Sequence, residues 1–405
     1  MKIAVVTYRF PYPPDRGDRL SMYTLLRLFS QRHQVTLFSF VDGTEPPEAR
    51  ERISAFCERI ETVHLGKARS WLQAWLGLFG RVPSQVAYFR SAAMNARVRQ
   101  ALAAERFDVV FVHAFRVAPC VEGVRHPGIV MWLGDSVGMV LKRAAGYAPW
   151  WRRPGLLWEA ARADSYAVEC SRRATESWVL SPVDQADLER HGAVRLVLLP
   201  HGVDDALYSL PRAIASPAEI VFLGNLSVPH NVDAACYAAR EVWPLVHARH
   251  ADAKLRLVGA DPVPAVQALG ALPGVEITGP LPDLRDMWSR AQVMLAPLRF
   301  SAGIQNKLLE AIAAGVPVVT SPGAAGGIGA RHGEHVLVAT TEREYADAVE
   351  SVLAQPAEAA ARAARAREHV RREFSWERLV RRLEQVGAAG SEAAIAEAAD
   401  AREGT

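Results

Sequence analysis

The stretch that decides the fold is Pro297-Leu-Arg-Phe-Ser-Ala-Gly-Ile-Gln-Asn-Lys-Leu-Leu-Glu-Ala-Ile-Ala-Ala-Gly-Val-Pro-Val-Val-Thr320. An apolar strand, Val293–Ala296, comes directly before it, and a helix is predicted from Gly303 to Gly315. Glycine is common just after the last turn of a helix, so Gly315 marks the predicted helix end, and Pro317 stands at the start of the next apolar strand. This order of strand, loop, helix and strand is typical of a parallel sheet covered by helices.

The same alternation extends over most of the chain. Strands are predicted at Ile3–Thr7, Val35–Phe40, Val109–His113, Ile129–Leu133 and Trp178–Leu180, then at Ile220–Leu223, Leu255–Val258, Val275–Thr278, Val293–Ala296 and Val316–Thr320. Helices are predicted at Ser21–Gln31, Ala92–Ala104, Val232–Arg249, Asp283–Arg290 and Ile304–Ala314. Two such series in succession predict an α/β protein with two Rossmann-like, doubly wound domains.

The predicted boundary between the two domains lies where Pro200-His-Gly-Val-Asp204 forms a turn-like stretch before Pro211 and Pro217. The N-terminal domain is therefore predicted as residues 1–205 and the C-terminal domain as residues 206–373. A helix with Ser375 as its N-cap is predicted over residues 374–386. Residues 387–405 are rich in Ala and nearly free of large apolar side chains, so they are expected to be disordered, with a frayed helix as the alternative.

Composition excludes several classes of protein. The chain has 405 residues, of which 50% are hydrophobic and 22% charged, which is typical of a globular protein. A net charge of +3 is too small to indicate nucleic-acid binding. No apolar run reaches the length of a membrane span, and the first residues are predicted as a strand rather than a signal peptide. Four widely spaced cysteines indicate reduced thiols without a zinc site, so a cytoplasmic protein is expected.

Lys307 and Glu310 are the first candidates for a binding site. They stand three residues apart near the start of the helix predicted from Gly303, where unpaired N–H groups and the helix dipole favour an anion such as a diphosphate. Lys307 would add a positive charge, and the carboxylate of Glu310 can accept hydrogen bonds from both hydroxyls of a ribose. The alternative is an ordinary ion pair on a solvated helix.

The run from Lys307 to Val319 resembles the donor-binding motif of the GT-B glycosyltransferases, specifically of glycosyltransferase family 4. Together with Tyr12–Asp18 and Val82–Ser91, it resembles the sugar transferases associated with exosortase (PEP-CTERM) exopolysaccharide systems. The resemblance implies two Rossmann-like domains facing a central cleft, and a last helix that crosses back to the N-terminal domain. It also implies retaining transfer of a sugar from a UDP- or GDP-linked donor, bound by the C-terminal domain, to a hydroxyl acceptor at the N-terminal domain.

The resemblance also assigns the donor site, with three departures. Glu310 matches the ribose-binding Glu of the family, whereas the first Glu of its Glu-x7-Glu motif falls on Ala302. In the loop after the strand Ile220–Leu223, the family's Arg falls on Asn225 and its Lys on His230. The expected donor-binding set is Gly17, Arg16, Gly224, Asn225, His230, Arg299, Gly303, Ile304, Lys307 and Glu310. Either substitute cations bind the phosphates or catalysis has been lost.

Two residues after strands of the N-terminal half complete the predicted catalytic set with Lys307. His113 ends the strand Val109–His113, and at this spacing the family has a His that contacts the donor sugar; a core histidine is the alternative. Asp135 follows the strand Ile129–Leu133 and would bind an acceptor hydroxyl, or else cap the next helix. Arg16 and Arg19 lie in the family's flexible loop, where Gly17 matches one of two glycines, and would either reach the phosphates or remain solvated.

Two aromatic and basic stretches are candidates for contact with the inner face of the plasma membrane. Residues 67–104 contain six basic residues and no acidic one, with Trp71, Trp75 and Phe79 among them. The second stretch is Tyr147–Trp158. Basic residues flanking Trp and Leu suit an anionic membrane surface and a lipid-linked glycan acceptor, whereas the alternative is packing in the core or between domains.

The predicted function is therefore retaining, metal-independent glycosyl transfer to a glycan, a lipid-linked or a small-molecule acceptor, in exopolysaccharide or other cell-surface glycan synthesis. No cofactor and no metal are expected, since no Asp-x-Asp motif ends a strand and Lys307 with the helix dipole can replace a cation. Two alternatives stay open: a nucleotide-sugar epimerase on the same fold, and a degenerate scaffold without activity.

Overall fold

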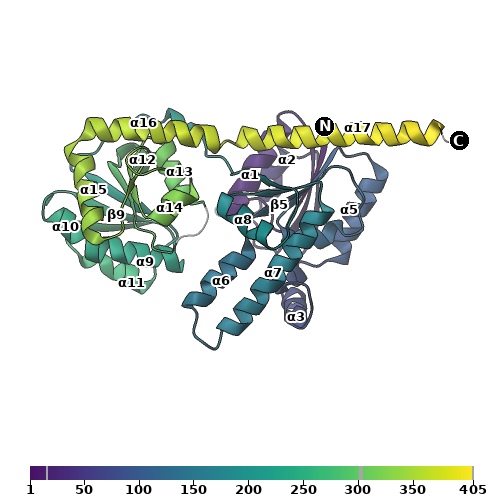
Figure 1. The fold of residues 1–405 in the computed structure, drawn as a ribbon, viewed down its shortest axis with the longest axis horizontal. Coiled ribbons are helices and arrows are strands. Elements are labelled where there is room, and N and C mark those ends of the chain that lie inside the picture. Colours follow the sequence, from purple (N-terminus) through teal and green to yellow (C-terminus); the bar gives the residue numbers. More distant parts are fainter. Residues whose placement is uncertain (15–16, 301–303, 404–405) are drawn as a thin grey trace. The chain divides into compact units, whose positions relative to one another are not determined.

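In a computed structural model of the chain, residues 1–14, 17–300 and 304–403 are described (Figure 1). They form two compact units. The first is Met1–His201 together with Trp376–Thr405, and the second is Gly202–Ser375. These limits lie a few residues from the predicted boundaries after residues 205 and 373. Among the described residues, no helix has both the length and the apolar character needed to cross a membrane.

The first unit is built on a sheet of seven parallel strands in the order β3-β2-β1-β4-β5-β6-β7. The strands are β1 (Lys2–Thr7), β2 (Gln34–Val41), β3 (Arg59–His64), β4 (Val109–His113), β5 (Ile129–Gly134), β6 (Glu176–Val179) and β7 (Leu196–Leu198). β3 and β7 were not predicted. Every residue of β3 but its last is half-buried and three of its six are charged or His, so it gives no apolar run. β7 is apolar but has only three residues, and no strand was predicted there.

Helices connect these strands. They are α1 (Gly17–Ser30), α2 (Ala49–Ser54), α3 (Lys67–Gly77), α4 (Ser84–Tyr88), α5 (Ala92–Ala104), the 3₁₀ helix η1 (Phe115–Val121), α6 (Val137–Tyr147), α7 (Arg153–Arg173), α8 (Pro182–Arg190) and α17 (Trp376–Glu403). All the strands run in the same direction, so the carboxyl ends of β1, β4 and β5 lie at the same edge of the sheet.

α17 is the part of the first unit that comes last in the sequence. Its Leu379, Leu383 and Val386 are buried in the same core as residues of α1 and β1. Gly387 lies against Met1, since a Cβ there would stand 2.5 Å from the Met1 sulfur. For the described part of residues 387–405 the structure shows the helical alternative and not disorder, because α17 continues without a break to Glu403. Ala and Glu are strong helix formers, and extending an anchored helix requires no new nucleation.

The second unit is built on six parallel strands in the order β10-β9-β8-β11-β12-β13. The strands are β8 (Glu219–Leu223), β9 (Lys254–Val258), β10 (Val275–Gly279), β11 (Val293–Ala296), β12 (Val318–Thr320) and β13 (Leu337–Val338). The helices are η2 (Asp205–Ser209), α9 (Pro229–Tyr237), η3 (Ala238–Val242), α10 (Trp243–His247), α11 (Pro264–Gln267), η4 (Ala268–Ala271), α12 (Arg285–Arg290), α13 (Asn306–Ala313), α14 (Pro322–Gly327), α15 (Glu342–Ala354) and α16 (Pro356–Glu373).

The helix predicted over Val232–Arg249 is interrupted. The chain forms α9, then the π-helical turn η3, then α10. Pro244 explains the interruption, since it has no N–H to donate to the turn before it, and a wider turn fills the gap.

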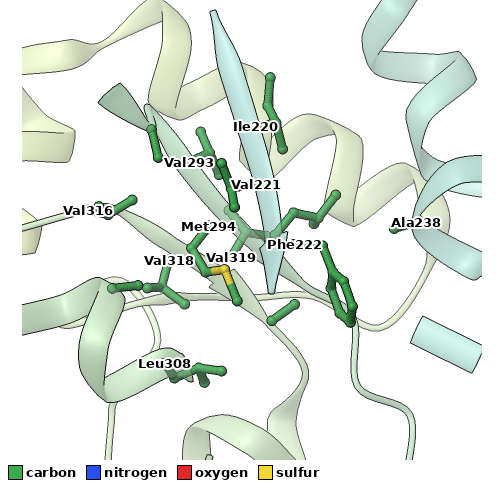
Figure 2. Packing of buried hydrophobic residues seen from close by; sticks show 14 of the residues in the cluster. Ile220, Val221, Phe222, Ala238, Val293, Met294, Leu308, Val316, Val318 and Val319 are labelled. Atoms are coloured by element: carbon green, nitrogen blue, oxygen red, sulfur yellow. The ribbon is translucent and has the colours of Figure 1, made fainter. Parts of the chain in front are cut away.

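α13 is the helix that the decisive stretch predicted, and it lies against the centre of the second sheet. Its Leu308 belongs to the same buried cluster as Phe222 of β8, Met294 of β11 and Val318 of β12, and Figure 2 shows it next to Val318. Gly315 ends the helix with a φ of 75°, a conformation that favours glycine. The helix begins at Asn306, however, and not at Gly303.

Candidate active site

The second unit reverses its strand order between β8 and β11, the two strands from which the sheet extends in opposite directions. In a doubly wound sheet, the carboxyl ends of such strands border a crevice that binds ligands. The loop after β8 leads into α9, and the chain after β11 leads into α13. Most of the predicted donor residues lie on these two segments.

Lys307 is on the first turn of α13 and points toward the β8–α9 loop. Its ammonium donates a hydrogen bond to the Asn231 side chain and lies 5.2 Å from the centroid of the Phe222 ring. Burial lowers the pKa of Lys307 to about 8, although Glu310 opposes this shift. A buried ammonium of this kind gains much from an anionic ligand, because the ligand replaces lost water.

Glu310 stands one turn further along α13. Burial raises its pKa to about 7, and the Asp204 carboxylate acts in the same direction, while the Trp288 indole and Lys307 oppose the rise. The alternative of a solvated ion pair is wrong. Both side chains are half-buried, and Lys307 donates to Asn231 rather than to Glu310. α13 therefore presents one cation and one carboxyl group whose charges are easily changed near neutral pH.

Asn231 connects Lys307 to the glycine of the β8–α9 loop. Its side-chain amide is buried and donates to the Asn225 carbonyl oxygen at 3.0 Å. A Cβ on Gly224 would stand 2.8 Å from the Asn231 Cγ, and a Cβ on Gly259 would stand 1.7 Å from the Gly224 oxygen. Gly224 is thus required by packing, since any side chain would displace the residue that holds Lys307.

Asn225 and His230 occupy the positions of the family's two cations, and neither supplies a full positive charge. The Asn225 side chain accepts hydrogen bonds from the Ser227 N–H at 2.9 Å and hydroxyl at 2.6 Å, and donates to Asp261 at 3.2 Å. It is therefore occupied by its own turn. Burial and the charge of Lys307 lower the pKa of His230, so its neutral form is favoured at neutral pH.

Arg299 was expected to help bind the phosphates, but the structure pairs it with a carboxylate. Its guanidinium holds Asp233 through two hydrogen bonds, one of them from Nε at 2.9 Å, and lies 4.9 Å from the Tyr237 ring centroid. The Asp233 carboxylate raises the pKa of Arg299, and it also neutralises the charge that a phosphate would meet. The expectations on Arg16, Ala302 and Gly303 lie outside the described residues, and Ile304 packs half-buried on the core.

His113 ends β4 at the carboxyl edge of the first sheet. Its Nδ1 lies 3.2 Å from the Thr7 hydroxyl, whose own proton goes to the Arg9 carbonyl at 3.1 Å. This arrangement assigns the proton to Nδ1 and leaves Nε2 as a hydrogen-bond acceptor. Burial lowers the pKa of His113 to about 4, with Asp18 opposing, so the ring is neutral at neutral pH. The ring can accept a hydrogen bond from a hydroxyl group but cannot supply a positive charge.

Tyr8 and Asp18 surround His113. The Tyr8 ring stacks on the His113 ring with centroids 5.3 Å apart, and its hydroxyl donates to Asp18 at 2.7 Å. Arg9 donates to the same Asp18 oxygen at 3.1 Å. Gly17, the predicted loop glycine, is the first residue of α1, one position before Asp18. This edge thus holds one carboxylate, one neutral imidazole and one phenol within a single hydrogen-bonded group.

Asp135 follows β5 at the same edge as His113. It does not cap α6, because the N-cap is Ser136, whose hydroxyl accepts from the Met139 N–H. Asp135 is exposed by surface area, yet desolvation by the protein packed around its carboxyl group and the neighbouring Asp184 raise its pKa to about 6, while Arg116 opposes the rise. Arg116 also acts on the pKa of His113, so it lies near both predicted catalytic residues of this unit.

One group of potential metal ligands is found among the described residues, namely Asp164, Asp187 and His191 of the first unit. The Lys142 ammonium lies 2.6 Å from an Asp164 oxygen and 3.2 Å from His191 Nε2. This ammonium faces Asp164, and Arg190 lies 3.2 Å from an Asp187 oxygen, so both carboxylates already have a cation. The group therefore acts as a structural link between α6, α7 and the end of α8.

Four residues of these sites escaped sequence analysis. Tyr8 and Arg116 follow β1 and β4 by one and three positions, so the strand order β2-β1-β4-β5 would have pointed to them. Asn231 and Asp233 lie on α9, and their pairing with Lys307 and Arg299 crosses 76 and 66 residues of sequence. No local pattern signals such pairs.

Comparisons with known proteins identify one domain of this chain. Residues 217–355 match the family of glycosyl transferases group 1, so the second unit contains a domain of that type. An exopolysaccharide phosphotransferase of Streptomyces coelicolor is 29% identical over 193 residues, which are 45% of this chain and 19% of the relative. The chain thus spans about a fifth of the length of the curated relative it matches.

Solved structures resemble nearly the whole chain. Anabaena HepE in complex with UDP and glucose has a TM-score of 0.62 at 16% identity, covering 97% of this chain and 99% of that one. Sucrose-phosphate synthase from Thermosynechococcus elongatus has a TM-score of 0.69 at 17% identity, covering 97% and 100%. WaaG, a glycosyltransferase involved in lipopolysaccharide biosynthesis, has a TM-score of 0.61 at 18% identity, covering 91% and 95%. These likenesses confirm the predicted GT-B class of two doubly wound α/β units.

Proposed function

We propose that this protein is a retaining glycosyltransferase that moves a sugar from a nucleotide-diphosphate sugar to a hydroxyl acceptor. The observation that carries the proposal is the pair on α13. Lys307 is a half-buried cation held by Asn231, and Glu310 is a half-buried carboxyl group on the same face of the helix. A nucleoside diphosphate offers a matching pair of groups, an anionic diphosphate and a ribose diol.

In this proposal Lys307 and the N-terminal end of α13 bind the departing diphosphate. Negative charge grows on the leaving group as the bond to the anomeric carbon breaks, and groups already oriented toward that charge lower the barrier. The remaining positions contribute little charge, since Arg299 is neutralised by Asp233 and the neutral form of His230 is favoured. Lys307 then carries most of the stabilisation, and we propose that no metal and no cofactor are needed.

In this proposal the first unit binds the transferred sugar and the acceptor. His113 Nε2 accepts a hydrogen bond from a sugar hydroxyl, and Asp135 receives one from the acceptor. With its pKa raised to about 6, Asp135 still bears a charge at neutral pH and can take up a proton from an attacking hydroxyl. The acceptor attacks the face that the diphosphate leaves, which retains the anomeric configuration.

The comparisons support the class of donor and product. HepE was solved with UDP and glucose, so among the UDP- and GDP-linked donors a UDP-sugar is the first to test. The Streptomyces relative acts on exopolysaccharide by its name, and WaaG is involved in lipopolysaccharide biosynthesis, which support a cell-surface glycan as the product. A cytoplasmic site of action and the link to exosortase systems remain predictions from the sequence.

A degenerate scaffold is the second candidate, and Arg299 and Asn225 favour it. Arg299 holds the Asp233 carboxylate and the Asn225 amide is engaged with Ser227 and Asp261, so both side chains offer less to a phosphate than the resemblance implies.

Calorimetry and thermal shift with UDP, GDP, ADP and TDP test the proposal, without added metal and with Glu310→Ala as the control. Tight binding of one diphosphate that the control loses would support the transferase, and NMR of the anomeric proton in the product would then report retention. Binding of none would favour the scaffold. Release of a sugar inverted at C2 without any acceptor would favour an epimerase.

A further inference from the structure

The first unit exposes large apolar side chains on two segments that are far apart in the sequence. On α3 and the turn after it these are Trp71, Leu72, Trp75, Leu76, Leu78 and Phe79; on α6, α7 and the loop between them they are Val140, Trp150, Trp151, Leu157 and Trp158. Phe79 and Trp150 are each 80% exposed. Exposure of this extent excludes the core packing that the sequence left open, and contiguous apolar surface of this kind marks an interaction site.

The two segments belong to one surface. The buried Arg162 of α7 donates to the Gly80 carbonyl oxygen at 2.9 Å and to that of Leu78 at 3.3 Å, just after α3. One turn before it, Trp158 holds its ring centroid 5.9 Å from the Arg162 guanidinium. Figure 1 shows α6 and α7 as a pair that projects from the sheet of the first unit, with α3 beside α7. The loop with Trp150 and Trp151 lies at the tip of that pair.

The segments that form this surface are basic, although carboxylates of neighbouring segments pair with four of their basic residues, namely Lys67, Arg90, Arg97 and Lys142. Residues 67–104 carry six basic and no acidic residues, and residues 137–158 carry four basic and no acidic residues. Arg69, Arg81, Arg143, Arg152 and Arg153 are exposed. The whole chain has a net charge of only +3, so this concentration is local.

Charge also decides between two partners for this apolar surface, a second copy of the chain and a lipid membrane. In a symmetric pair of two copies, the same patch would meet itself and bring arginine close to arginine. An anionic bilayer attracts those arginines, and tryptophan prefers the level of the lipid headgroups. We propose that this surface, formed by α3 and the α6–α7 pair, binds the headgroup region of an anionic phospholipid membrane. The proposal goes beyond the transfer reaction and does not depend on it.

Sedimentation of the full chain with vesicles tests the proposal. Phosphatidylcholine vesicles with and without about 30% phosphatidylglycerol serve as probes. We expect binding to the anionic vesicles only, and weaker binding at higher salt. The double variant Trp150→Ala/Trp151→Ala should bind at least tenfold more weakly, because both side chains lie exposed at the tip. Arg152→Glu should weaken binding several-fold, since each basic residue near such a surface contributes about fivefold.

Matched controls separate these effects from general damage. Ile214→Ala removes an exposed apolar side chain, and Arg343→Glu reverses an exposed charge, both in the second unit. Neither should change vesicle binding, and thermal melting should show that all variants fold. Wild-type protein that stays in the supernatant, or tip variants that bind like the wild type, would overturn the proposal. So would a dimer, seen by light scattering, that the tip variant dissociates. UDP binding measured on the same samples tests the proposed function separately.

Discussion

Glu310→Gln should stabilise the second unit at the same time as it weakens nucleotide binding. Burial raises the pKa of Glu310 from 4.5 to about 7. The folded state thus holds the proton more tightly than the unfolded state. The stability from this group is fully present below pH 4.5 and is lost as pH rises through 7. At about 1.4 kcal/mol per pH unit, the total loss is about 3 kcal/mol.

The pH dependence distinguishes this cause from ordinary packing effects. With pKa values of 4.5 unfolded and about 7 folded, about 2 kcal/mol of the loss falls between pH 5.5 and pH 8. Gln cannot titrate, so the variant avoids this loss. Relative to wild type it should therefore gain about 2 kcal/mol over that interval, a factor of about 30 in an equilibrium constant. Loss of the Glu310 charge also leaves Lys307 without its carboxylate, which reduces the gain.

Hydrogen exchange of peptides from β8, β11 and β12 measures this effect within the second unit. Wild type and variant are compared at the same pH, so that intrinsic exchange rates cancel. Glu368→Gln is the matched control, because Glu368 is an exposed carboxylate on α16 of the same unit. A difference between wild type and Glu310→Gln that is the same at pH 5.5 and pH 8 would refute the reasoning. In calorimetry the variant should lose about tenfold or more in UDP affinity, because a charged acceptor of two hydroxyls is removed.

Three further outcomes are expected. Burial lowers the pKa of Lys307 to about 8, so Lys307 loses its proton as pH rises and UDP affinity should fall up to tenfold per pH unit above pH 8. Calorimetry in two buffers at pH 8.5 should detect proton uptake on UDP binding, and Lys307→Met should abolish this uptake. Gly224→Ala places a Cβ 2.8 Å from the Asn231 amide and should cost about 1–3 kcal/mol; unchanged denaturant stability and UDP affinity would contradict the packing argument. Arg382→Ala breaks the half-buried pair with Glu176 and should raise the exchange rate of α17 by roughly fivefold, a loss of about 1 kcal/mol, whereas the exposed Arg381→Ala should not.

Much of the fold could be predicted from local sequence patterns. Most strands are short apolar runs, and the α13 stretch shows a strand, a helix and a helix-ending glycine in succession. β3 was missed since its alternate charged residues hide a strand near the edge of the sheet. The start of α13 was placed three residues early, since Gln305, the residue before Asn306, provides no side-chain cap that would mark the first turn in the sequence. Lys307 and Glu310 could be singled out from their place near the start of a helix and from the motif around them. The partners of Lys307 and Arg299 could not be found in this way, since Asn231 and Asp233 lie on α9 and meet them only after the sheet forms.

The membership of α17 in the first unit has a consequence for the order of synthesis. Residues 376–386 leave the ribosome after the whole of Gly202–Ser375, which at about 5–20 residues per second is a delay of roughly 10–35 s. During that time the apolar side chains of α1 that share a core with α17 lack their partners from this helix. The nascent protein thus has the sequence of its second unit complete before that of its first.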